Sequence, residues 1–80
     1  MIVLLKLLEK NSDYVIYAYG YDEDSLNGEI KVSLNNPDEY RLIKESDDKR
    51  IGRKGTLIAI NKVIKAVKDN EIEEILSYQS

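Results

Sequence analysis

Alternation of apolar and polar side chains predicts two neighbouring β-strands in the first half of the chain. Residues 14–21 read YVIYAYGY, which is rich in residues that favour strands. After a polar connector that ends in an Asn-Gly pair, residues 29–34 read EIKVSL, with an apolar side chain at every second position. We therefore expect an antiparallel hairpin whose second strand turns Ile30, Val32 and Leu34 toward the core.

Two further segments leave a choice between strand and helix. Leucine is a good helix former, but the start of residues 2–9 and the Asn-Ser-Asp turn after them favour a strand, which we prefer. Residues 39–45 follow Pro37, which either belongs to a type I turn before a fourth strand or opens a helix. This second choice decides the fold, and we prefer the strand.

From residue 56 the pattern changes to that of an amphipathic helix, predicted over residues 56–69 with Thr56 as its cap. A break near Asn70 is expected, because a longer helix would place Glu71 in the apolar stripe. Residues 71–78 then form a short helix, which we slightly favour, or a final edge strand. The apolar side chains that share one third of the predicted helix surface are Leu57, Ile60, Val63, Ile64 and Val67.

These elements predict one small α+β domain over residues 1–80: an antiparallel meander of three or four strands, with the C-terminal helix packed on one face. A KH-like arrangement is the alternative. The acidic connector, the Asn-Gly-Glu-Ile stretch and residues 59–72, AINKVIKAVKDNEI, resemble small bacterial α+β domains of unknown function. That resemblance implies strands before the helix and carries no known activity.

The composition argues against most catalytic chemistry. Cysteine and histidine are both absent, so the chain has no disulfide, no thiolate metal site and no imidazole base. We expect no enzyme, no metal and no cofactor, since no carboxylate pair stands in an apolar setting. The apolar residues 1–8 are too short to span a bilayer and lack the flanks of a signal peptide. We expect a cytoplasmic protein without a membrane partner.

Charge is distributed unevenly along the chain. The net charge is -3, yet residues 49–68 hold seven cations and no acid, so the remaining residues sum to -10. Two glycines bracket two cations in RIGRKGT, residues 50–56, a loop suited to binding an anion through backbone amides. The candidate anion or nucleic-acid contacts are Lys49, Arg50, Gly52, Arg53, Lys54, Gly55, Lys62, Lys65 and Lys68.

Residues 51–55, Ile-Gly-Arg-Lys-Gly, resemble the Gly-x-x-Gly loop of KH domains, which joins two helices and clamps a single-stranded nucleic-acid backbone. The resemblance implies binding to single-stranded RNA through this loop and the following helix. In place of the apolar end of the preceding helix, this chain has the charged residues 47–50, DDKR.

The stripe formed by Tyr17, Tyr19 and Tyr21 is a candidate interaction face. Aromatic side chains on a sheet can stack on bases, but we favour a structural role, in which Ala18 and Gly20 make room for the helix and the tyrosines cover the opposite face or a partner. One helix cannot cover a sheet that is apolar on both faces. We therefore expect protein–protein interaction or self-association, for example as a dimer, with RNA binding as the alternative.

Overall fold

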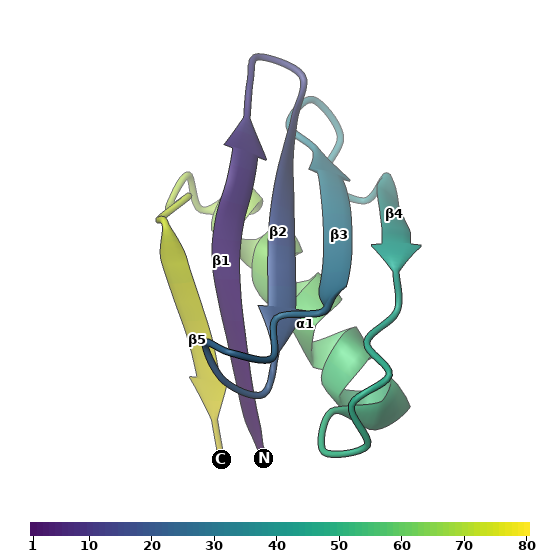
Figure 1. The fold of residues 1–80 in the computed structure, drawn as a ribbon. Helices are drawn as coiled ribbons and strands as arrows, with labels where there is room; N and C mark the ends of the chain where they lie inside the picture. The colour runs from purple at the N-terminus through teal and green to yellow at the C-terminus, as the bar shows by residue number, and fades with distance from the viewer.

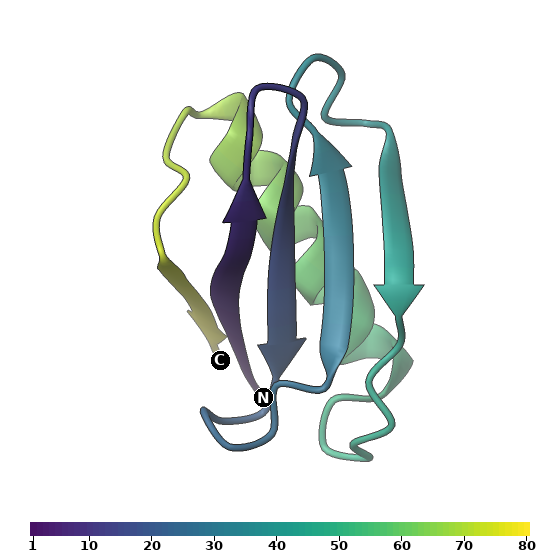
Figure 2. The same cartoon turned by 45° about the horizontal axis from the view of Figure 1, so that its top comes forward.

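The computed structural model describes residues 1–80 and contains β1 (Ile2–Lys10), β2 (Tyr14–Gly20), β3 (Gly28–Ser33), β4 (Tyr40–Lys44), α1 (Gly52–Lys68) and β5 (Ile75–Gln79). All strands join one sheet in the order β4-β3-β2-β1-β5, and every pairing is antiparallel. The helix crosses one face of this sheet diagonally, and no helix covers the other face (Figures 1 and 2).

The predicted α+β class is confirmed, with five strands in place of three or four. The hairpin of β2 and β3 is present, and the segments 2–9 and 39–45 are both strands, as preferred from the sequence. The KH-like alternative is wrong, because it requires a helix where β4 pairs with β3. The segment between β4 and α1 is irregular, so the Gly-x-x-Gly loop does not join two helices.

The favoured short helix over residues 71–78 is also wrong. This segment contains β5, which pairs with β1 and becomes an edge of the sheet (Figure 1). Its side chains alternate: Leu76 and Tyr78 pack against the core, while Ile75 and Ser77 are exposed. The pairing of Leu76 with Leu5 offers this alternating segment more apolar contact than an isolated two-turn helix would gain.

The helix begins at Gly52 and not at Thr56. Thr56 is buried within the helix, and no side chain caps the N-terminus of the helix. Its end agrees with the predicted break near Asn70. That residue has a φ of 55°, and the next amide, that of Glu71, donates to the carbonyl of Ala66 at 2.8 Å. A left-handed residue followed by such a backward bond is a common way to end a helix.

The buried side of α1 is rotated relative to the predicted apolar stripe. Leu57 was expected in that stripe, but its side chain is 52% exposed. Small side chains let the helix backbone approach the sheet closely, and this favours a buried side that includes them over one that includes Leu57. The buried helix residues are Gly55, Thr56, Ala59, Ile60, Val63 and Ala66.

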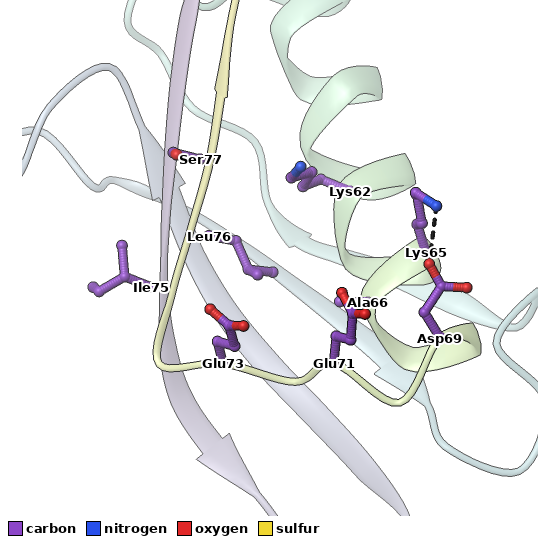
Figure 3. A pocket seen from close by; sticks show the side chains of 9 residues that line it. All are labelled: Lys62, Lys65, Ala66, Asp69, Glu71, Glu73, Ile75, Leu76 and Ser77. Atoms are coloured by element: carbon purple, nitrogen blue, oxygen red, sulfur yellow. Dashed lines mark hydrogen bonds and ion pairs between the residues drawn. The ribbon is translucent and has the colours of Figure 1, made fainter.

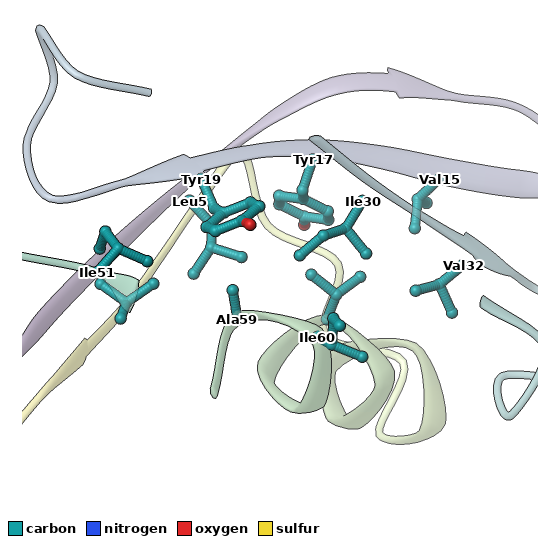
Figure 4. Packing of buried hydrophobic residues seen from close by; sticks show 11 residues of the cluster. Leu5, Val15, Tyr17, Tyr19, Ile30, Val32, Ile51, Ala59 and Ile60 are labelled. Carbon is teal, nitrogen blue, oxygen red and sulfur yellow. The ribbon is translucent and has the colours of Figure 1, made fainter. Parts of the chain in front are cut away.

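The face of the sheet that packs against the helix is not the one that we expected. Tyr17 and Tyr19 have no exposed surface and point toward the helix (Figure 4). Ala18 and Gly20 lie on the other face, where the connector 21–27 passes over the sheet. A Cβ atom added to Gly20 would lie 1.8 Å from the carbonyl oxygen of Ser25. The small residues therefore make room for this connector and not for the helix.

Candidate functional site

Both glycines of the Gly52–Gly55 loop serve the fold. Gly52 has a φ of 61°, a conformation that a residue with a side chain rarely adopts, and this lets the chain turn into the helix. A Cβ atom on Gly55 would lie 2.7 Å from Cγ2 of Ile51, whose side chain is buried in the core. Backbone conformation at Gly52 and local packing at Gly55 thus explain why glycine stands at these positions without any bound anion.

Arg50 is held by neighbouring groups. Its guanidinium donates to both oxygens of Asp48, at 3.0 and 2.7 Å, and lies 4.1 Å from the centre of the Tyr21 ring. Hydrogen bonds from Arg50 lower the pKa of the Asp48 carboxyl below its usual value. Asp48 also accepts from the backbone N–H of Arg50, so this group of side chains fixes the turn before the helix.

Two of the three predicted helix lysines are paired with acids. Lys65 contacts Asp69 at 2.9 Å, and Lys68 contacts Asp38 at 3.1 Å. These ion pairs are exposed and contribute little to stability, but they reduce the cationic character of the helix. The predicted contacts that form no ion pair are Lys49, Arg53, Lys54 and Lys62.

The structure does not bring the three tyrosines together as an exposed surface. Tyr17 donates a hydrogen bond from its hydroxyl to the backbone carbonyl of Glu73, and burial, with a smaller effect of the Glu73 charge, raises its pKa to about 12. The buried Tyr19 hydroxyl lies 2.8 Å from Oγ1 of Thr56 and accepts from the N–H of Ser46 at 3.0 Å. Only Tyr21 is partly exposed, beside Arg50.

An apolar surface does remain on the uncovered side of the sheet, over β1 and β5. Ile2, Leu8 and Ile75 are 37%, 53% and 50% exposed. Val3 and Leu76 pack on the core, so alternation directs Ile2 and Ile75 to the face without a helix. At Leu8 the register of β1 shifts, and Leu8 and Glu9 both stand opposite Ile16, whose neighbours Val15 and Tyr17 face the core, so Leu8 lies on the same face. We call Ile2, Leu8 and Ile75 the apolar strip. A single cation, Lys6, lies among these side chains, opposite Ile75 in the pairing of β1 with β5.

Charged side chains occupy most of the other half of the same face, over β3 and β4, where Ile43 is also 44% exposed. Glu29 and Lys31 lie beside Ala18 and Ile16 of β2, and Arg41 lies beside Lys31. In residues 2–9 leucines fall on both faces of a strand, and this is the sequence signal for the apolar half. Ile75 was not expected on this face, because the favoured prediction for residues 71–78 was a short helix. The face thus combines an apolar side with a charged side.

A groove of about 280 Å³ separates the second half of α1 from β5 (Figure 3). Leu76 points into it toward the helix, Ile75 points away, and Lys62 lies at its upper end. No cluster of three or more carboxylates forms that could hold a metal ion, and no helix is both long enough and apolar enough to cross a membrane. The other residues that line the groove are Lys65, Ala66, Asp69, Glu71, Glu73 and Ser77.

Comparison with known proteins gives no match: no family model, no curated protein and no solved structure resembles this chain closely enough to be significant.

Proposed function

We propose that this chain is a non-enzymatic interaction domain that binds a protein through the uncovered face of its sheet. The observation that supports this proposal is the apolar strip, in which Ile2, Leu8 and Ile75 remain between 37% and 53% exposed. Protein interfaces combine exposed apolar side chains with polar and charged ones. Here Lys6 stands among the three apolar side chains, and charged residues of β3 and β4 border them on one side.

The absence of catalytic chemistry is part of the proposal. The phenol with the strongly raised pKa, that of Tyr17, is fully buried and bonded to a backbone carbonyl. The Tyr19 hydroxyl is likewise engaged inside the core. The groove beside β5 is lined by an ion pair between Lys65 and Asp69 and by the exposed carboxylates of Glu71 and Glu73, and none of these acids stands in an apolar setting.

A matched pair of leucines tests the proposal. Leu8 on the uncovered sheet face and Leu57 on the outer side of the helix are 53% and 52% exposed. The wild-type chain, Leu8→Lys and Leu57→Lys are immobilised, and proteins enriched from an extract of the source cells are quantified. We expect Leu8→Lys to lose the enriched proteins and Leu57→Lys to keep them. Equal enrichment by all three chains would contradict the proposal.

Binding of single-stranded nucleic acid is a second candidate. The observation that favours it is that Lys49, Arg53 and Lys54 are exposed beside the start of the helix and form no ion pair. Three cations at one end of the molecule are sufficient for a weak contact with phosphates. This candidate predicts strong dependence on salt, which binding through the apolar strip does not.

A further inference from the structure

The two edges of the sheet differ in their protection against pairing with another strand. On β4, Arg41 and Lys44 place charges on the edge, and an irregularity at Glu29 and Ile30 disturbs the register. Charges and bulges of this kind are devices that keep strand edges from pairing. The other edge, β5, reads Ile-Leu-Ser-Tyr-Gln and carries neither a charge nor a proline. Its edge is therefore open to another strand.

Backbone hydrogen bonding identifies the free groups on β5. The carbonyl of Glu74 accepts from Leu7, and the N–H of Ser80 donates to Met1, so even-numbered residues of this segment face β1. In an antiparallel ladder successive residues point their N–H and C=O groups to opposite sides. The backbone groups of Ile75, Ser77 and Gln79 consequently point away from the sheet.

We propose that β5 pairs with β5 of a second copy of this chain, antiparallel and centred on Ser77. In this register Ser77 lies opposite Ser77 of the second copy, and Ile75 lies opposite Gln79. Each of these opposed pairs exchanges two hydrogen bonds, so all free N–H and C=O groups of the three residues are satisfied at once. The same strand thus provides both halves of a symmetric contact.

Side chains on the helix side of the sheet fit this register. Leu76 lies opposite the second copy's Tyr78 in a pair that shares no backbone hydrogen bonds, where side chains approach most closely. Leu76 also forms the wall of the groove beside the helix. A Tyr78 ring from the second copy would therefore extend over the groove between Leu76 and Ala66. One occupant would cover both the open edge and the cavity beside it.

Charge selects the antiparallel orientation. Glu71, Glu73 and Glu74 precede β5 directly, and the strand itself is neutral. Antiparallel pairing places these acidic segments of the two copies at opposite ends of the contact, whereas parallel pairing would place like charges side by side.

This inference deepens the proposed function and rests on it, because the joined sheet of ten strands would extend the uncovered face across both copies. The apolar strips of the two copies would then flank the new contact, with Ile75 of each copy next to it. The helices of both copies would lie together on the other face of the joined sheet. Such a dimer would present a larger binding face to a third protein than one chain does.

Charge reversal at the symmetry axis tests the inference. Because Ser77 meets itself, Ser77→Lys places two cations together and Ser77→Glu places two anions together, while a mixture of both variants pairs opposite charges. We expect wild type to sediment as a dimer, with each single variant at least tenfold weaker in self-association. An equimolar mixture of the two variants should recover the dimer. Ser12→Lys, the same exchange in the exposed turn before β2, should leave the dimer unchanged.

A proline variant separates loss of the contact from loss of the fold. Ser77→Pro removes an N–H group that points away from β1, so the circular dichroism spectrum should persist while the dimer dissociates. A wild-type chain that stays monomeric up to about 1 mM, or variants at Ser77 that dimerise as well as wild type, would overturn the inference. Failure of the proposed function is a separate result, since it appears as protein enrichment that Leu8→Lys does not change.

Discussion

The hydroxyl of Tyr19 joins three parts of the structure that lie far apart in the sequence. It contacts Thr56 in the first turns of α1 at 2.8 Å and accepts from the backbone N–H of Ser46 at 3.0 Å, and all three residues are buried. Tyr19→Phe removes this oxygen and leaves the shape of the ring unchanged. The variant therefore measures what the buried polar contacts contribute to stability.

The expected loss follows from the groups left without a partner. The Thr56 hydroxyl can turn toward the carbonyl four residues earlier in its own helix, as threonines in helices do. The N–H of Ser46 has no such alternative, and a buried donor without an acceptor costs about 1–3 kcal/mol. We expect Tyr19→Phe to lose about 2 kcal/mol of unfolding free energy. For a chain of this size, the Tm would then fall by about 8–16 °C.

Urea unfolding at neutral pH, followed by circular dichroism, measures this loss. Tyr40→Phe is the matched control, because Tyr40 is 49% exposed and its hydroxyl makes no hydrogen bond, so its unfolding free energy should change by less than about 0.5 kcal/mol. Tyr19→Phe combined with Thr56→Val should cost less than the two single variants together, since both remove the same contact. Equal stability of Tyr19→Phe and wild type would refute the reasoning.

Three further predictions concern other parts of the chain. Gly28→Ala places a Cβ atom 2.1 Å from Cε1 of Tyr19, so urea unfolding should show a loss of about 1–3 kcal/mol, and no loss would mean that the ring can move freely. Burial raises the pKa of Tyr17 from 10.0 to about 12, so the neutral phenol is favoured in the folded state. The Tyr17 phenol should accordingly lower the unfolding free energy above pH 10 by at most about 1.4 kcal/mol per pH unit, and Tyr17→Phe should remove this contribution. If the chain binds single-stranded RNA, Arg53→Glu with Lys54→Glu should abolish binding and leave self-association intact. The wild-type affinity should then fall by about 0.7 logarithmic units for each contacted phosphate per tenfold rise in salt. An affinity that is independent of salt would exclude that mechanism.

Strand periodicity was the most informative part of the sequence. The alternation in residues 29–34 predicted correctly which side chains of β3 face the core, and the preference for strands at residues 2–9 and 39–45 was confirmed. Asn70 marked the end of the helix for a local reason, its ability to adopt a positive φ. These features depend on neighbours in the sequence, so they can be read without knowledge of the tertiary contacts.

The faces of β2 and the nature of β5 depended on contacts that the sequence does not state. The sequence favoured the Ala18 and Gly20 face of β2 for the helix, but small residues on α1 and the connector over Gly20 place the helix against the tyrosine face. Residues 71–78 have apolar spacing compatible with a short helix, but pairing with β1, more than 65 residues earlier in the chain, makes Ile75–Gln79 a strand. Long-range contacts of this kind override weak local preferences.

The candidate site could be predicted only in part. The cations of residues 49–68 were evident from the sequence, but the pairing of Lys68 with Asp38 depends on the fold. The sequence predicted that one helix cannot cover both apolar faces of the sheet, and Leu8 is indeed 53% exposed. Because Tyr17 and Tyr19 are buried, they cannot form the candidate interaction face. The exposed aliphatic side chains of β1 and β5 form it instead.

The central claim is that a protein covers the uncovered sheet face, and photo-crosslinking in living cells tests it most directly. A benzophenone-bearing amino acid replaces Leu8 in one chain and Leu57 in another, two positions of almost equal exposure on opposite sides of the molecule. We predict discrete protein adducts after irradiation at position 8, and none at position 57. Adducts at position 57 alone, or at neither position, would contradict the claim.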